Sequence, residues 1–207
     1  MIVYFVRHGE SEGNETKKHQ SPDTPLSKKG IKQAGILARR LKKLPIDVVY
    51  ASHWVRAKQT AEIISKSIKK PVEYWEDLRE ISFPSELWNM SYENDKSKVI
   101  RKLIKKNWDK GNWKYSDEET FDELAKRADE VLKNLLAHHK GQSVLCVSHG
   151  TMIGMMVAKM VFAETLTPAM FWRMRYHFIS GNTGITECWY SKDRGWTLTT
   201  WNDTTHL

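Results

Sequence analysis

The sequence is short of cysteine and of long apolar runs. Its 207 residues include two cysteines, Cys146 and Cys188, which lie far apart in strand-like segments. Two distant cysteines do not make the disulfide framework of a secreted domain, and free cysteines in such segments usually pack as small hydrophobic side chains. The first apolar run, Ile2 to Val6, is too short for a signal peptide or a membrane span. These absences favour a reduced, cytoplasmic globular protein without a membrane partner.

Two kinds of ligand-binding motif are also missing. No glycine-rich loop of the nucleotide-binding type is present, which argues against a nucleotide-dependent kinase. No His-Glu-x-x-His spacing or comparable third ligand accompanies the histidines, which argues against a zinc site. We therefore expect neither a metal ion nor a cofactor. Eleven glycines and six prolines further exclude collagen-like and proline-rich disordered classes.

Positive charge is in excess. The formal net charge is +8, and the sequence pI is about 9.4. Such a balance is compatible with nucleic acid, with an anionic membrane surface, or with small anionic substrates drawn into a cleft. Charge alone does not choose among these partners.

Apolar strand-like runs alternate with amphipathic helical patterns along most of the chain. This alternation predicts one α/β domain over residues 1–207, with three α/β/α layers and a mostly parallel central sheet. Expected strands cover 2–6, 47–51, 72–75 and 143–147, followed by antiparallel edge strands at 186–190 and 196–201. Expected helices cover 28–41, with Ser27 as N-cap, then 54–69, 121–135 with Gly141 as its C-terminal cap, and 152–161.

The segment from about 82 to 117 does not fit that alternation. It is rich in Lys, Trp and Asn and has only one short amphipathic stretch, at 99–104. We interpret it as a cap or lid inserted into the domain.

Two histidines follow strands in the same way. Val6-Arg7-His8-Gly9 and Val147-Ser148-His149-Gly150 each run from an apolar strand through one polar residue to His and Gly. If the two strands are neighbours in a parallel sheet, both imidazoles face one crevice at its carboxyl edge, beside Arg7. Arginine forks match phosphate oxygens, and a neutral imidazole can attack phosphorus. The pattern therefore points to phosphoryl transfer.

Six segments in order resemble the histidine phosphatase superfamily, which includes phosphoglycerate mutase. Arg7-His8-Gly9 resembles its signature, and Val147-Ser148-His149-Gly150 its second histidine. The others are Pro25 to Ala34, which resembles the start of its first helix; Ala51 to Ala61, with Arg56-Ala57 and Gln59-Thr60-Ala61; Leu78-Arg79-Glu80-Ile81, its acid motif; and Asn182-Thr183, its late strand. The resemblance implies a phosphoglycerate mutase-like fold.

The same resemblance implies roles for six side chains. His8 would be the nucleophile that becomes phosphohistidine. Glu80 would protonate the leaving oxygen and then activate water; Glu76, Asp77 and Glu86 lie nearby, but the Leu-Arg-Glu-Ile context favours Glu80. The phosphoryl oxygens would be held by Arg7, Asn14, Arg56 and His149. His19, His53, His138, His139, His177 and His206 carry no motif and are expected to be structural or exposed.

Two departures from the family pattern bear on the reaction. Ser82 to Asn89 stand where many family phosphatases have Gly-x-Trp-Glu-Gly, which leaves the substrate open. The Glu-Arg-His-Tyr-Gly element of the mutases is absent. We therefore expect a metal-independent phosphatase that hydrolyses monoesters of small phosphorylated metabolites through phosphohistidine. The alternative enzyme is a cofactor-dependent phosphoglycerate mutase-type phosphotransferase.

A third hypothesis is a basic nucleic-acid-binding module on a phosphatase-like fold. Residues 96–114 include eight Lys or Arg side chains interleaved with Trp108 and Trp113, a pattern that can track single strands. It equally describes the solvated face of a helix with its tryptophans packed inward. No nucleic-acid fold motif accompanies it, so we favour the solvated face and a small phosphorylated substrate as partner. A basic lid could also steer polyanionic substrates to the crevice.

Overall fold

The central sheet is built around two strands that read as apolar runs. In a computed structural model that describes residues 1–207, β1 (Ile2–Arg7) and β4 (Ser143–Ser148) lie side by side and parallel. All six residues of β4 are buried, as expected for a parallel strand covered on both faces. The sheet order is β3-β2-β4-β1-β5-β6.

The remaining strands extend the sheet in both directions. β2 (Val48–Ala51) pairs in parallel with β4, and β3 (Val72–Tyr74) pairs in parallel with β2. On the other side, β5 (Ile185–Ser191) and β6 (Gly195–Asp203) add two antiparallel strands. The mostly parallel sheet predicted from the sequence is confirmed.

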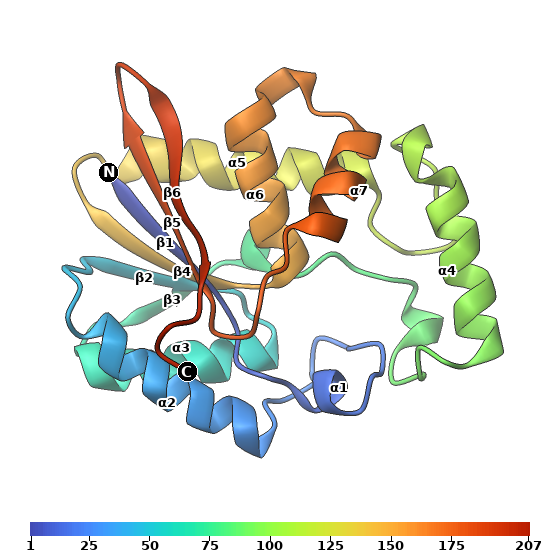
Figure 1. Ribbon diagram of the computed structural model, residues 1–207, viewed down its shortest axis with the longest axis horizontal. Helices are drawn as coiled ribbons and strands as arrows, with labels where there is room; N and C mark the ends of the chain where they lie inside the picture. The colour runs from blue at the N-terminus through green and yellow to red at the C-terminus, as the bar shows by residue number, and fades with distance from the viewer.

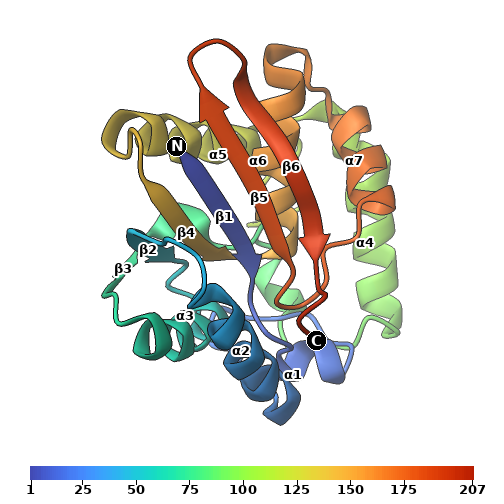
Figure 2. The same cartoon turned by 60° about the vertical axis from the view of Figure 1, so that its left-hand side comes forward.

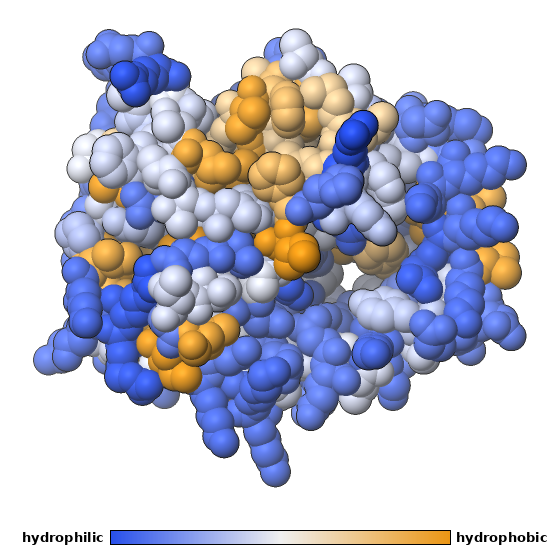
Figure 3. Space-filling model, in the orientation of Figure 1, coloured by the Kyte–Doolittle hydropathy of each residue, from blue (hydrophilic) through white to orange (hydrophobic).

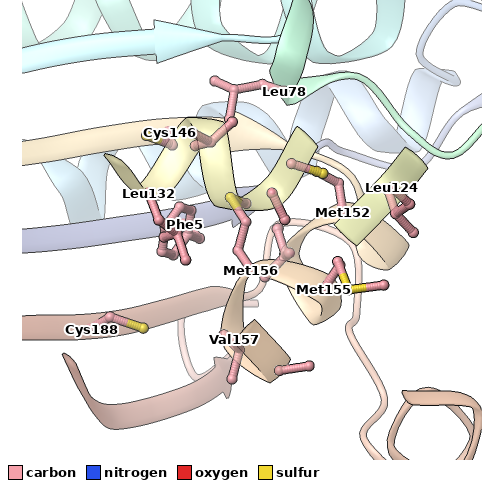
Figure 4. Packing of buried hydrophobic residues seen from close by; sticks show 14 of the residues in the cluster. Phe5, Leu78, Leu124, Leu132, Cys146, Met152, Met155, Met156, Val157 and Cys188 are labelled. Carbon is pink, nitrogen blue, oxygen red and sulfur yellow. The ribbon is translucent and has the colours of Figure 1, made fainter. Parts of the chain in front are cut away.

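Helices cover both faces of the sheet (Figures 1 and 2). α2 (Lys28–Leu41) and α3 (Val55–Ile68) lie on one face, and α5 (Phe121–His138) and α6 (Gly150–Phe162) on the other. Neighbouring residues of β1 serve opposite cores, since side chains alternate along a strand. Tyr4 packs with α2 and α3, whereas Phe5 packs with α5 and α6, in one cluster with Leu132 and Met156 (Figure 4). The three-layer architecture is thereby confirmed.

The segment between β3 and α5 holds more regular structure than its composition suggests. Its helix, α4 (Asp95–Asn107), is longer than the expected 99–104, because the Asn94 side chain accepts hydrogen bonds from the amides of Lys96 and Ser97 and starts the helix early. Short 3₁₀ turns lie at 85–87 and 108–110. The helix stands apart from the four sheet-covering helices (Figure 1) and has its own small cluster of Leu87, Ile100 and Ile104.

Two local expectations need correction. α7 (Pro168–His177) was not expected; Thr167 caps it through the Met170 amide, and Pro168 occupies its first turn, which is a readable start signal. Gly141 does not cap α5, which ends at His138; with φ +79° it forms the turn into β4. The short α1 (Glu12–Glu15) follows β1.

No helix in the structure combines the length and apolarity needed to cross a membrane.

Candidate active site

The two motif histidines meet at one edge of the sheet. Arg7 pairs with Ser148 at the ends of β1 and β4, so the residues that follow emerge side by side. The ring centroids of His8 and His149 lie 5.1 Å apart, and both side chains are buried. Adjacent parallel strands therefore bring both imidazoles into one crevice, as the sequence pattern predicts.

His8 is held in one tautomer. Its Nδ1 lies 2.6 Å from the Gly9 carbonyl oxygen, which can only accept, so Nδ1 carries the proton. The Nε2 lone pair is then free and accepts from Arg56 Nε at 3.2 Å. Burial, followed by the charges of Arg56 and Arg7, holds the pKa of His8 well below its usual value of 6.5. The imidazole is therefore neutral, which is the state that a nucleophilic nitrogen requires.

Hydrogen-bond donors converge around Nε2 of His8. Arg56 is almost fully buried at the start of α3, where its Nη1 donates to the Ser21 carbonyl at 3.0 Å. Burial lowers the pKa of Arg56 to about 10, which leaves it charged at neutral pH. Arg7 Nε and His149 Nδ1 are buried and have no partner within the protein. Neither arginine forms an ion pair, so the two charges and the open Arg7 Nε donor suit a doubly charged oxyanion.

Asn14 borders the same cavity from α1. Its Oδ1 accepts from the Ser11 amide at 3.2 Å and from Asn182 Nδ2 at 3.3 Å, and Asn182 Nδ2 also donates to the His8 carbonyl at 3.1 Å. These bonds fix the side chain and occupy Oδ1, and the side-chain amide nitrogen of this cavity-lining residue has no partner in the protein. Ser11 itself is fully buried and caps α1.

Glu80 supplies the single carboxylate of the cavity. Its Oε1 accepts from the Ile81 and Met152 amides at 3.0 and 3.2 Å, and its Oε2 from the Thr151 amide at 3.2 Å. Two of these donors belong to the first turn of α6, whose dipole favours a carboxylate there. The other acids of this region, Glu76, Asp77 and Glu86, do not line the cavity.

A buried network fixes the chain just before Glu80. Three consecutive carbonyls accept from buried side chains at 2.7 Å: those of Asp77 and Arg79 from Arg127 Nη1, and that of Leu78 from Ser148 Oγ. Arg127 in turn pairs with Glu119 at 2.6 Å. No motif singles out Arg127; its only signal is a charge on the apolar face of a helix. We assign it as a positioning residue for Glu80.

Arg127→Met is expected to lower the free energy of unfolding by about 3 kcal/mol, because it leaves Glu119 buried with one partner fewer. Urea unfolding measures the loss. Lys133→Met is the matched control: it removes an exposed pair with Glu130 on the same helix and should cost less than about 0.5 kcal/mol. Equal losses in the two variants would contradict a stabilising role for the buried Arg127 network.

The buried histidines also predict a pH dependence of stability. Burial lowers the pKa of His8 and His149 well below 6.5, and that of His19 to about 4. In the unfolded chain these imidazoles take up a proton near pH 6.5, whereas in the folded chain they stay neutral. The free energy of unfolding must therefore fall as the pH drops below 6.5. Each histidine contributes a slope of up to about 1.4 kcal/mol per pH unit. Urea unfolding between pH 6.5 and 5.5 should show it; His149→Gln should reduce the slope, whereas exposed His138→Gln should not.

The cavity has a volume of about 460 Å³ and contains every residue named as a candidate except His149, which lies behind it against His8. It also contains residues without a sequence motif: His19, Gln20, Trp54, Tyr92, Trp172 and Arg175. His19 is buried, as expected of a structural histidine, and its Nε2 lies 2.8 Å from Ser97 Oγ, which joins the loop after α1 to α4. No group of three His, Cys, Asp or Glu side chains is placed to hold a metal ion.

Gly9 serves the fold rather than a ligand. A Cβ there would lie 2.6 Å from the Gly30 carbonyl oxygen, and a Cβ on Gly30 would lie 1.9 Å from the Glu10 carbonyl oxygen. The two glycines let the loop after His8 contact the start of α2. From the sequence, Gly9 was expected to allow a tight turn or the close approach of a ligand. The structure shows instead that it allows the backbone at Gly9 to lie against the backbone at Gly30.

Comparison with known proteins shows the family to which the chain belongs and the structures that it resembles. Residues 3–204 match the model of the histidine phosphatase superfamily (branch 1). A probable phosphoglycerate mutase GpmB of Proteus mirabilis is 30% identical over 99% of this chain and 94% of its own. Phosphoserine phosphatase of Entamoeba histolytica has a TM-score of 0.81 at 27% identity, over 100% of this chain and 98% of its own. Bacillus stearothermophilus YhfR has a TM-score of 0.83 at 25% identity, over 99% and 98%.

Proposed function

The chain belongs to the histidine phosphatase superfamily, and from that premise we propose that it is a phosphatase that hydrolyses phosphate monoesters of small metabolites through a phosphohistidine. The observation that carries the proposal is the environment of His8. The neutral imidazole points its Nε2 lone pair at Arg56, Arg7 adds a buried donor without a partner, and His149 adds a buried ring nitrogen without a partner. This arrangement combines a nucleophile with a binding site for a phosphate dianion.

The reaction follows from these positions. Arg7, Asn14, Arg56 and His149 bind the phosphoryl oxygens, and Arg56 Nε moves from His8 Nε2 to a phosphoryl oxygen. Glu80 takes up one proton from solvent as the substrate binds. Nε2 then attacks phosphorus, the P–O bond to the leaving oxygen breaks, and Glu80 gives that proton to the leaving oxygen. In the second step Glu80 takes a proton from water, the water oxygen attacks phosphorus, and the N–P bond breaks. Phosphate leaves, Glu80 returns its proton to solvent, and both residues are back in their starting states.

We also propose that the 82–117 segment forms a cap over the site. Tyr92 and Phe83 of this segment line the cavity beside Glu80, and backbone hydrogen bonds tie it to the loop after α1, between Asn89 and His19 and between Tyr92 and Lys17. Trp108 and Trp113 pack on buried clusters, while the lysines of α4 are exposed to solvent. We propose that the segment selects the leaving group. The cytoplasmic location stays a prediction, for which both cysteines, present as buried thiols, are the support.

A phosphoglycerate mutase is the second candidate, since a relative at 30% identity bears that name. Both reactions share the phosphohistidine, and they differ in whether water or a second substrate accepts its phosphoryl group. The mutase motif Glu-Arg-His-Tyr-Gly is absent after Glu80, which favours water.

The deciding experiment is phosphate release from 4-nitrophenyl phosphate and a panel of phosphometabolites, in the presence of a chelator. A phosphatase should release one phosphate per alcohol and leave the product unphosphorylated. Interconversion of 2- and 3-phosphoglycerate that depends on added bisphosphoglycerate, with little phosphate release, would instead establish the mutase. Folded protein with neither activity would overturn both.

A further inference from the structure

The position of Glu80 marks where the leaving group must lie. This inference rests on the proposed function, in which Glu80 protonates the leaving oxygen, so the alcohol part of the substrate extends past Glu80 and away from His8. Thr151 lies on that path: its amide donates to Glu80, and its Oγ1 accepts from Arg175 Nε at 3.4 Å. Arg175, an exposed residue of α7, therefore stands next to the exit of the leaving group.

The cavity does not end at Arg175. A second cavity of about 470 Å³ lies between α4 and α7 and shares Phe83, Tyr92, Trp172 and Arg175 with the first. In the space-filling view a hollow separates the hydrophilic side of α4 from the rest of the molecule (Figure 3). The Trp108 indole N–H donates to the Pro168 carbonyl at 3.2 Å and joins the two walls. The two cavities adjoin at these shared residues, and together their walls reach from His8 to α4.

Aromatic rings and cations alternate on the walls of the second cavity. The Trp108 and Trp172 ring centroids lie 5.7 Å apart. Arg175 and Lys105 sit over the Trp172 ring at 5.7 and 5.5 Å, and Arg101 sits over Tyr92 at 5.3 Å. Broad aromatic walls suit a flat apolar group, which they can contact over a large area.

Charge is unbalanced in this space. Glu80 is the single carboxylate that lines either cavity. Arg7 and Arg56 match the two charges of one phosphate, but Arg175, Arg101, Lys102 and Lys105 also line the space, and none of them forms an ion pair in the structure. One phosphate group leaves these cations unmatched, so a second anion on the same substrate would be bound strongly.

We propose that the substrate is a phosphomonoester whose alcohol part is an extended aromatic group carrying a second anion, and that Arg175 binds this anion. The phosphate sits on His8, the aromatic body lies between Tyr92 and Trp172, and the second anion lies between α7 and α4. A carboxylate, sulfonate or second phosphate would satisfy the site, because each accepts charge-assisted hydrogen bonds from a guanidinium.

The test compares 2-naphthyl phosphate with 6-sulfo-2-naphthyl phosphate in the wild type and in Arg175→Gln. The ratio of wild-type to variant kcat/KM for each substrate cancels the intrinsic reactivity of its leaving group. Loss of Arg175 should reduce kcat/KM for the sulfonated substrate about tenfold more than for the plain one. Arg173→Gln is the matched control, since Arg173 lies exposed on the same helix and lines neither cavity. Equal losses for both substrates, or the same selectivity change in Arg173→Gln, would overturn the proposal.

A binding measurement separates this proposal from the proposed function. The alcohols 2-naphthol and 6-hydroxynaphthalene-2-sulfonate are titrated calorimetrically into wild type and Arg175→Gln, without any turnover. Tighter binding of the sulfonate that disappears in Arg175→Gln supports the anion site even if no phosphate is ever released. Equal binding of the two alcohols to the wild type overturns it even if the protein is an active phosphatase.

Discussion

Replacing His8 with alanine is expected to lower kcat by at least about 10⁴-fold for every phosphomonoester, because no phosphohistidine can form. The loss should not depend on the leaving group, since Nε2 of His8 is the attacking atom in all cases. Steady-state phosphate release measures it. A second readout is the phosphoenzyme itself: wild type quenched during turnover of ³²P-labelled substrate should carry acid-labile, alkali-stable label, and His8→Ala should carry none.

Two controls make the result specific to His8. His138→Ala removes an exposed histidine at the end of α5 and should retain activity within about twofold. Circular dichroism should show His8→Ala folded, because its imidazole makes few bonds that hold the sheet together. Activity above about 1% of wild type in folded His8→Ala would mean that another group attacks phosphorus.

Replacing Glu80 with glutamine is expected to cost about 10² to 10⁴ in kcat/KM for alkyl phosphates, which need a proton on the leaving oxygen. The loss should be much smaller for 4-nitrophenyl phosphate, because nitrophenolate leaves without one. Glutamine keeps the size of the side chain, and its single oxygen can still accept from the amides of Ile81 and Met152, whereas the Thr151 amide loses its acceptor. The comparison of substrates therefore reports acid catalysis rather than collapse of the site.

Glu80 also acts as the base in the second step, and this gives a separate signature. With 4-nitrophenyl phosphate, Glu80→Gln should form phosphoenzyme quickly and hydrolyse it slowly, so a burst of nitrophenolate should precede slow turnover. Glu76→Gln is the control, since Glu76 is exposed outside the cavity. A uniform loss on both substrate types without a burst would assign the acid to another residue.

Local patterns carried much of the information about this fold. β1 and β4 are recognisable because buried parallel strands are nearly continuous apolar runs, and α2 because Ser27 caps it before a 3.6-residue apolar repeat. The expected helix at 99–104 was too short and α7 was overlooked, although Asn94 and the Thr167-Pro168 pair mark their starts. Only α7 has weak apolar periodicity, with Phe171 as its one buried residue; α4 is amphipathic, and it was expected too short because its first turn, from Asp95 to Lys98, is polar.

The residues of the candidate site also fall into two groups, those that the sequence marks and those that only the structure identifies. His8 and His149 are legible as strand-end residues, and the resemblance adds Arg7, Asn14, Arg56 and Glu80. Arg127 and Arg175 have no such signature, because what matters is the group that each one reaches. Arg127 contacts carbonyls 48 and 50 residues away in sequence, and Arg175 reaches Thr151 across 24 residues. Pairings of that kind depend on how helices pack, which no short spacing encodes.

By itself, the sequence determined the α/β alternation, the two histidines at strand ends and the family to which they belong. These follow from side-chain periodicity and from motifs in which neighbouring residues act together. The tertiary structure alone decided that β1 and β4 are adjacent, that His8 is neutral with Nε2 free, and that α4 and α7 enclose a cationic aromatic space beyond Glu80. The physical reason is that burial, tautomer and charge balance are properties of groups brought together from distant parts of the chain, and they exist only once the layers have packed.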